Sequence, residues 1–155
     1  MKILLVGGCG FIGFNVLKHL ESQKYKNIYV VDNLSGQSSK KNYLKIKNEH
    51  QKVQFKNMDI SNFRKISNLI KKLKPDMILA LHGQVAVTKS IKNPRMDFNN
   101  NFLSIFNLWE TIKIFSPKSM IINLSSNKVY GKIKDLKFKE NKYKFSSNTL
   151  IDENN

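Results

Sequence analysis

The stretch "VGGCGFIG", Val6–Gly13, joins a short apolar run to the start of a helical pattern. Its glycines recur at every third position, as Gly7, Gly10 and Gly13. In a strand–turn–helix unit the first glycine permits the tight turn, the second lets the backbone approach a pyrophosphate, and the third lets helix and strand pack closely. Three glycines alone are weak evidence, but a strand before them and a helix after them are the context that such a turn requires. The stretch therefore predicts a dinucleotide-binding turn with phosphates at the helix N-terminus.

Five short apolar runs alternate with helical patterns along the rest of the chain. This alternation is typical of βαβ units and a parallel sheet. Most of the runs are too continuously apolar for half-exposed strands, so we expect helices on both faces. The predicted fold class is α/β, a doubly wound parallel sheet of the Rossmann type. The five predicted strands are Ile3–Val6, Ile28–Val31, Val53–Phe55, Met77–Leu81 and Met120–Leu124.

Three stretches carry helical patterns of apolar residues. A first helix covers Phe14–Leu20, and Ser61 is the expected N-cap of a second. A third helix runs from about Asp97, and we assign its apolar stripe to core packing. The segment Ser35–Lys52 is polar and basic, and it predicts a loop with a short surface helix. The stripe of the third helix comprises Phe98, Phe102, Ile105, Phe106, Trp109 and Ile112.

Two carboxylates end predicted strands on the nucleotide side. Asp32 lies about 20 residues after Gly13, the offset of an acid that binds an adenosine ribose. A carboxylate there accepts hydrogen bonds from both ribose hydroxyls and repels a 2′-phosphate, so NAD is favoured over NADP; the alternative is a turn residue in "VDNLSG". Asp59 would receive the adenine amino group, or it is only an acid that starts a helix. Neighbouring residues assigned to the same cofactor site are Phe11, Ile12, Asn33 and Ile60.

Charge sets the chain apart from an average domain. Its 155 residues include 27 Lys and Arg against 11 Asp and Glu, a formal net charge of +16. Such an excess is typical of nucleic-acid binding. However, Arg64 and Arg95 are the only arginines, and the lysines are spread over every segment. We therefore favour a solvated lysine-rich surface and expect no nucleic-acid partner, with a polyanion-binding face as the alternative.

The remaining composition bears on the compartment. One cysteine, Cys9, permits no internal disulfide and suits a reducing environment. The apolar run Ile3–Val6 is shorter than the ~7–15 residues of a signal-peptide core, and no run approaches the ~20 residues of a membrane span. We expect a cytoplasmic protein with no membrane association, and we predict no metal site.

At this point the residues resemble the extended short-chain dehydrogenase/reductase family of NAD-dependent sugar-nucleotide epimerases and dehydratases. The motifs that carry the resemblance occur in family order over essentially the whole chain: "GGCGFIG", "VDNLSG", "MDIS", "HGQVAVTKSIKNPRMDFNNN" and "SSNKVYG". The last two most resemble the branch of CDP-sugar 2-epimerases. The resemblance implies NAD as cofactor, a nucleotide-sugar substrate with a CDP-sugar favoured, and a homo-oligomeric full-length protein. UDP-sugar 4-epimerisation is the alternative.

The resemblance also assigns roles near the end of the chain. Ser126, five residues before the glycine of "VYG", would act with a Tyr-x-x-x-Lys pair in proton transfer, Ser125 would line the cofactor, and Asn101 would support the active site. The alternative for the serines is that they merely end a strand. Two stretches depart from the family: His-x-Ala-Gly is replaced by Ala80-Leu81-His82-Gly83, and a common Gly-Thr by Ser104-Ile105.

The Tyr-x-x-x-Lys spacing occurs twice, at Tyr43–Lys47 and Tyr130–Lys134. The first lies on the adenosine side, and Gly131 disfavours a helix at the second. The family places the true pair beyond the serine loop, after a "DE" like that at Asp152. We therefore expect residues 1–155 to be the NAD-binding domain of a longer epimerase, incomplete at its C-terminal end and inactive alone. The alternatives are a non-catalytic NAD-binding module and a basic nucleic-acid-binding protein.

Overall fold

The computed structural model describes residues 1–84, 86–126, 138–141 and 144–147. It divides into two compact units, Met1–Leu124 and Ser125–Asn155. The first unit contains a five-stranded parallel sheet with strand order β3-β2-β1-β4-β5. In the second unit β6 (Phe138–Asn141) pairs with β7 (Lys144–Ser147) in antiparallel fashion.

The sheet confirms the predicted α/β fold. Its central strand β1 pairs with β2 on one side and β4 on the other, so that Leu5 lies between Val30 and Leu79. Each predicted strand is present, with ends that differ by one or two residues. The strands are β1 (Lys2–Val6), β2 (Asn27–Asp32), β3 (Gln54–Asn57), β4 (Met77–Ala80) and β5 (Met120–Asn123).

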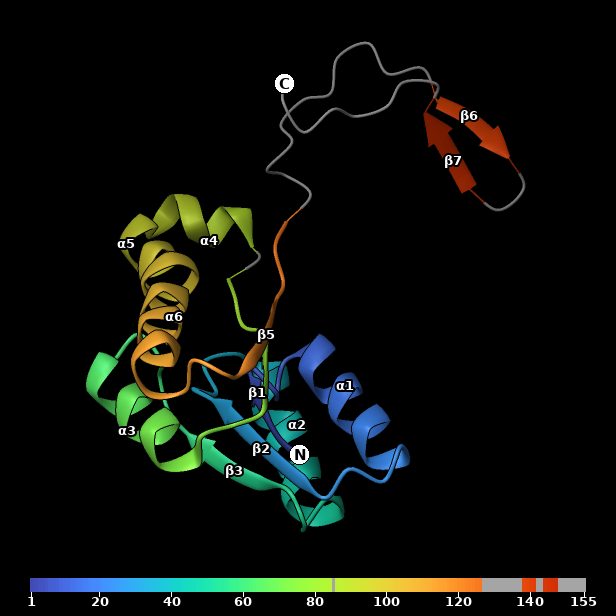
Figure 1. Cartoon of the computed structure of the whole chain (residues 1–155). Coiled ribbons are helices and arrows are strands. Elements are labelled where there is room, and N and C mark those ends of the chain that lie inside the picture. The colour runs from blue at the N-terminus through green and yellow to red at the C-terminus, as the bar shows by residue number, and fades with distance from the viewer. Residues whose placement is uncertain (85, 127–137, 142–143, 148–155) are drawn as a thin grey trace. The chain divides into compact units, whose positions relative to one another are not determined.

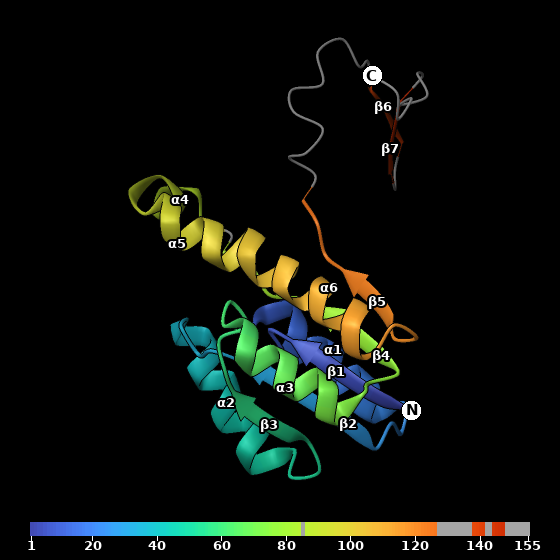
Figure 2. The same ribbon diagram turned by 60° about the vertical axis from the view of Figure 1, so that its left-hand side comes forward.

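Helices cover both faces of the sheet (Figures 1 and 2). On one face lie α3 (Phe63–Leu73) and α6 (Ser104–Phe115), and on the other lie α1 (Phe11–Ser22) and α2 (Gln37–Glu49). Two shorter helices and a π-helical turn lead into α6: α4 (Val87–Lys92), α5 (Pro94–Phe98) and η1 (Asn99–Leu103).

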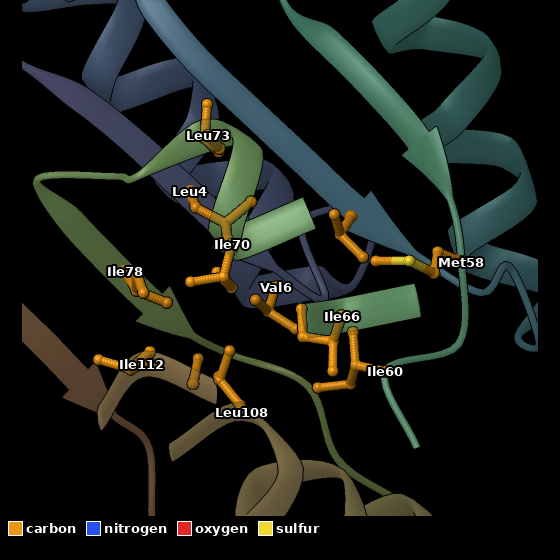
Figure 3. Packing of buried hydrophobic residues seen from close by; sticks show 12 residues of the cluster. Leu4, Val6, Met58, Ile60, Ile66, Ile70, Leu73, Ile78, Leu108 and Ile112 are labelled. Carbon is orange, nitrogen blue, oxygen red and sulfur yellow. The ribbon is translucent and has the colours of Figure 1, made fainter. Parts of the chain in front are cut away.

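Two layers of buried apolar side chains hold the sheet and helices together. In the layer under α3 and α6, Ile66 and Ile70 of α3 and Leu108 of α6 pack on Leu4 and Ile78 of the sheet (Figure 3). Each of these five side chains is fully buried. At roughly 25 cal/mol per Å² of apolar surface, a buried Leu or Ile contributes ~1.5–3 kcal/mol, so this layer fixes the strand ends that carry the site.

Two helices differ from the prediction. Helix α2 has 13 residues and fills most of the segment expected to be a loop with a short helix, because Ile46 and Tyr43 anchor its otherwise polar sequence on the sheet. The N-cap of α3 is Asn62 and not Ser61: its side-chain oxygen accepts a hydrogen bond of 3.0 Å from the Lys65 N–H.

The aromatic stripe of the third predicted helix was wrongly assigned to the core. Ile105 and Ile112 do pack there, but the four aromatic residues Phe98, Phe102, Phe106 and Trp109 are 51–56% exposed. The phenylalanines stack on one another, with ring centroids 5.1 and 6.2 Å apart. The buried face of α6 carries Ser104, Asn107, Leu108, Thr111 and Ile112. Apolar periodicity missed it because three of these five side chains are polar.

Strand β5 also differs from the expectation of full cover. Ile121 packs against the layer under α3 and α6, whereas Met120, Ile122 and Leu124 are 43–57% exposed. Since side chains alternate between the two faces of a strand, the second face of β5 is uncovered in the part of the chain that the structure describes.

Candidate functional site

An open pocket lies where the sheet strands end at their carboxyl side. The segments that follow β1, β2, β3 and β4 all contribute to its walls. This is the edge at which open α/β sheets bind ligands. The predicted site residues that line it are Gly7, Gly10, Asp32, Asn33, Asp59 and Ile60, together with Ser35, Ser39, His82, Gln84, Asn100, Ser104 and others.

The glycine turn has the geometry that its spacing predicts. Gly7 has a φ of 77°, which L side chains rarely adopt, and a Cβ on it would lie 2.7 Å from the backbone of His82. A Cβ on Gly13 would lie 2.3 Å from the Gly7 carbonyl oxygen, so α1 packs directly on the turn. Gly10 precedes the first residue of α1, where no side chain caps the helix within the described residues. The N–H groups of Gly7 and Gly10 bond to the Val31 and Gly7 carbonyls, so the positive end of α1 is what this region presents to the pocket.

Asp32 is buried at the end of β2 and accepts two backbone hydrogen bonds. Its Oδ2 receives the Cys9 N–H at 3.0 Å, and its Oδ1 receives the Leu34 N–H at 2.9 Å. Burial raises the pKa of this carboxyl, and the two hydrogen bonds oppose that shift. Each oxygen retains acceptor capacity, because a carboxylate oxygen has two lone pairs. The two interpretations of Asp32, turn residue and ligand acceptor, are therefore compatible.

Cys9 is part of the framework of the turn. Its side chain is fully buried, and its carbonyl accepts a 3.0 Å hydrogen bond from Nδ2 of Asn42 on α2. Burial, and then the nearby Asp32 charge, raise the pKa of the thiol to about 12. A thiol that stays protonated at neutral pH is a poor nucleophile, so Cys9 packs and does not react.

The loop after β3 forms a second wall. Oδ1 of Asp59 accepts the Ser61 N–H at 2.8 Å, which is a local turn, and the residue itself is exposed. Ile60 is buried beside it. Buried Asn107 of α6 donates to the Ser61 carbonyl at 2.7 Å and thereby fixes this loop. Sequence reasoning missed Asn107 because one buried polar residue on a helix leaves no periodic signal.

The loop after β4 forms the third wall, and Asn101 holds it. Oδ1 of Asn101 accepts the Gln84 N–H at 2.6 Å, and its Nδ2 donates to the Gln84 carbonyl at 3.1 Å and to Oδ1 of Asp97 at 3.0 Å. Asn101 is not among the lining residues and acts through the loop that it clamps. The lining residues Gln84, Asn100 and Ser104 were not predicted as site residues, although Gln84 and Asn100 lie within the motif "HGQVAVTKSIKNPRMDFNNN".

His82 in this loop is largely buried and is one of the residues that line the pocket. Its Nε2 is 2.9 Å from Oγ of Ser104. Burial lowers the pKa of the imidazole to about 4, although the Asp59 charge acts in the opposite direction. The ring is therefore neutral at physiological pH.

Several predicted site residues do not line the pocket. Phe11 and Ile12 are exposed on the first turn of α1, and Gly13 is buried against the glycine turn. Ser125 and Ser126 follow β5 and belong to the second unit of the chain. Their roles, like that of Tyr130, which lies outside the described residues, stay predictions.

Comparisons with known proteins agree with this geometry. The chain is 37% identical to the CDP-paratose 2-epimerase of Salmonella typhi over 155 residues, which are 100% of this chain and 44% of that protein. It is 32% identical over 135 residues to the bifunctional UDP-glucose 4-epimerase and UDP-xylose 4-epimerase 1 of Pisum sativum, covering 84% of this chain and 38% of that protein. The chain thus spans less than half of the length of these relatives.

Solved structures share the fold. The UDP-Glc/GlcNAc 4-epimerase of Campylobacter jejuni superposes with a TM-score of 0.71 at 29% identity, over 84% of this chain and 38% of that one. UDP-glucose 4-epimerase from Brucella ovis, solved in complex with NAD, gives 0.69 at 26% identity, over 84% and 37%. Among the described helices none is long and apolar enough to cross a membrane. A family model described as GDP-mannose 4,6 dehydratase matches residues 4–148, and the chain belongs to that family.

Proposed function

We propose that this chain binds NAD and forms the cofactor-binding domain of a nucleotide-sugar epimerase. The observation that carries the proposal is the pocket at the carboxyl end of the sheet, where the glycine turn, the uncapped start of α1 and the buried Asp32 carboxylate converge. The family implies the same cofactor, and the Brucella ovis relative was solved with NAD.

The residues present fit a dinucleotide. Gly7 and Gly10 leave the turn without side chains, so that a pyrophosphate can approach the backbone. The carboxylate of Asp32 is fixed by two backbone N–H groups, so it accepts ribose hydroxyls without rearranging. The bound nicotinamide would supply reversible hydride transfer, and this chain's residues would bind and orient it.

The proposed reaction of the whole protein is epimerisation at C2 of a CDP-linked sugar, with UDP-sugar 4-epimerisation as the alternative. Likeness to the CDP-paratose 2-epimerase of Salmonella typhi over the whole chain favours the first, and likeness to the UDP-sugar 4-epimerases of Pisum sativum supports the second. Ser126 would hydrogen-bond the reacting sugar oxygen, and a tyrosine–lysine pair beyond Asn155 would move the proton.

A 4,6-dehydratase is disfavoured by three residues near the end of the chain. Elimination of the C6 hydroxyl requires an acid and a base beside the proton-transfer hydroxyl. In this chain Ser126 is at the position of the hydroxyl, Asn127 at that of the acid and Lys128 at that of the base. Asn127 neither donates nor takes a proton at neutral pH, and Lys128 is a cation where a carboxylate base is required. An NMR assay of the full-length protein with CDP-paratose, CDP-glucose and UDP-glucose distinguishes the outcomes, since a 4-keto-6-deoxy product would contradict epimerisation.

The cofactor assignment is tested by titrating NAD and NADP into the 155-residue chain and its Asp32→Ala variant. We expect the wild type to prefer NAD, because the Asp32 carboxylate repels a 2′-phosphate, and we expect Asp32→Ala to lose roughly 10-fold or more in NAD affinity. Glu49→Ala, which removes an exposed carboxylate at the far end of α2, is the matched control and should bind NAD as the wild type does. Equal affinity of the wild type for both cofactors would overturn the role of Asp32.

A cytoplasmic, homo-oligomeric full-length protein completes the proposal. The single cysteine, whose buried thiol suits a reducing environment, supports the compartment. A non-catalytic NAD-binding module is the second candidate, favoured by the absence of a usable Tyr-x-x-x-Lys pair within the 155 residues. It predicts NAD binding without turnover even in the full-length protein.

A further inference from the structure

One residue from each of the two stretches that depart from the family's pattern is in direct contact with the other. By the resemblance described above, His82 stands where the family commonly has alanine, and Ser104 where it commonly has glycine. They are 22 residues apart in sequence, on the loop after β4 and at the start of α6, yet Nε2 of His82 and Oγ of Ser104 are 2.9 Å apart. Two polar side chains at these positions thus form one hydrogen-bonded pair.

The direction of this hydrogen bond follows from the third partner. Oγ of Ser104 donates its proton to the carbonyl oxygen of Asn100 at 2.6 Å, and a hydroxyl has one proton to give. Toward His82 it must therefore accept, so Nε2 carries the proton and Nδ1 does not. Nδ1 is buried and makes no hydrogen bond within the described residues. A protonated ring would need an acceptor for an Nδ1–H, and none of these residues provides one. The ring is a neutral, single tautomer.

The π-helical turn separates the bonds made by the backbone and the side chain of Ser104. In an α-helix the Ser104 N–H would bond to the Asn100 carbonyl, but here it bonds to Asn99, one residue further back. The hydroxyl of Ser104 bonds to the Asn100 carbonyl. The His82–Ser104 pair thus ties the loop after β4 to an irregular turn whose next residue, Asn101, clamps Gln84.

We propose that His82 and Ser104 are positioning residues that hold the loop after β4 as a wall of the nucleotide pocket; this rests on the proposed function. The wall has two fixed points, His82 through Ser104 and Gln84 through Asn101, on either side of Gly83. The backbone of His82 abuts the glycine turn so closely that a Cβ on Gly7 would lie 2.7 Å away. Movement of the loop therefore changes the space in which the phosphates would lie.

The first test asks whether the hydrogen bond between His82 and Ser104 exists, and it needs no cofactor. In the 155-residue chain with 15N-labelled histidine, NMR should show His82 as the Nε2–H tautomer without titration between pH 5 and 8. Ser104→Ala should abolish this signature. An imidazole that titrates near its ordinary pKa, or exchanges between tautomers, would overturn the proposal whether or not NAD binds.

The second test asks whether the His82–Ser104 hydrogen bond positions the wall of the nucleotide pocket. Ser104→Ala should weaken NAD binding by roughly 3- to 10-fold, the loss of one net hydrogen bond, and His82→Gln, whose amide donates from a similar place, should bind more tightly than His82→Ala. The matched control is Ser67→Ala, which removes a buried hydroxyl bonded to Thr111 at 3.1 Å between α3 and α6. It should cost stability without changing NAD affinity.

The double variant His82→Ala/Ser104→Gly carries the family's alanine and glycine at these two positions. It should bind NAD more tightly than the combined effects of the single variants His82→Ala and Ser104→Gly predict. Equal NAD affinity for Ser104→Ala, Ser67→Ala and the wild type would show that the His82–Ser104 hydrogen bond has no role in NAD binding, and would overturn the positioning role. Failure of the wild type to bind NAD, with the tautomer confirmed, would overturn the proposed function and the positioning role while leaving the hydrogen bond in place.

Discussion

Asp32, His82 and Asn101 shape the pocket through the hydrogen bonds that they make within the protein. Asp32 orders the glycine turn through Cys9, His82 bonds to Ser104, and Asn101 bonds to both polar groups of the Gln84 backbone. A residue's chain position and chemistry predicted Asp32, because strand end and offset are both visible in the sequence. Chain position and chemistry did not predict the hydrogen bond of His82, because its partner Ser104 lies 22 residues further along the chain, at the start of α6.

The neutral state of His82 has a consequence for stability. Its pKa is about 4 in the folded chain against 6.5 for an ordinary histidine, so between these values the unfolded state binds more protons. Stability from this group is complete above pH 6.5 and falls as pH decreases toward 4, by up to about 3 kcal/mol at 1.36 kcal/mol per pKa unit. We expect denaturant unfolding of the wild type to lose stability in that window relative to His82→Gln, which does not titrate there.

The difference between these two curves isolates His82, because the Asp32 and Asp59 carboxyls are common to both proteins. Parallel curves from pH 4 to 7 would contradict the burial of a neutral imidazole. The difference should level off below pH 4, where both the folded and the unfolded forms carry the proton.

At the scale of elements, strands were predicted better than helices. The five strands are short, and all except β3 consist mostly of apolar residues, so they are recognisable in the sequence. Helix α6 instead buries a face that includes Ser104, Asn107 and Thr111. Each of these polar side chains has a hydrogen-bond partner in another element, which is what permits its burial. Partners of this kind are known only once the fold is known.

The start of α3 provides a test at the same scale. Asn62 accepts the Lys65 N–H, while the neighbouring Ser61 makes no such cap. We expect Asn62→Ala to lower the free energy of unfolding by about 1 kcal/mol, the usual contribution of an N-cap side chain, and Ser61→Ala to change it by less than half of that. Chemical denaturation of both variants measures this. The reverse order would restore Ser61 as the cap.

The sheet explains at the scale of the whole unit why the site could be located from sequence. Parallel strands in the order β3-β2-β1-β4-β5 bring the segments after β1, β2, β3 and β4 to one edge, although these segments are spread from Gly7 to Gln84. Strand prediction and the glycine turn were sufficient to predict that edge. The part of the pocket lined by Asn100 of η1 and Ser104 of α6 was not predicted. It depends on a π-helical turn, for which the sequence gives no recognisable pattern.

The exposed aromatic stripe determines what intrinsic tryptophan fluorescence can measure in this protein. Trp109 is the sole indole of the chain, and 52% of it is exposed. Its emission maximum should therefore already lie toward the red in the folded state and be quenched by iodide or acrylamide. Fluorescence would consequently follow whatever covers α6 and η1, and would register little of the melting of the sheet. Unfolding of the nucleotide pocket has to be followed by circular dichroism or by the tyrosines.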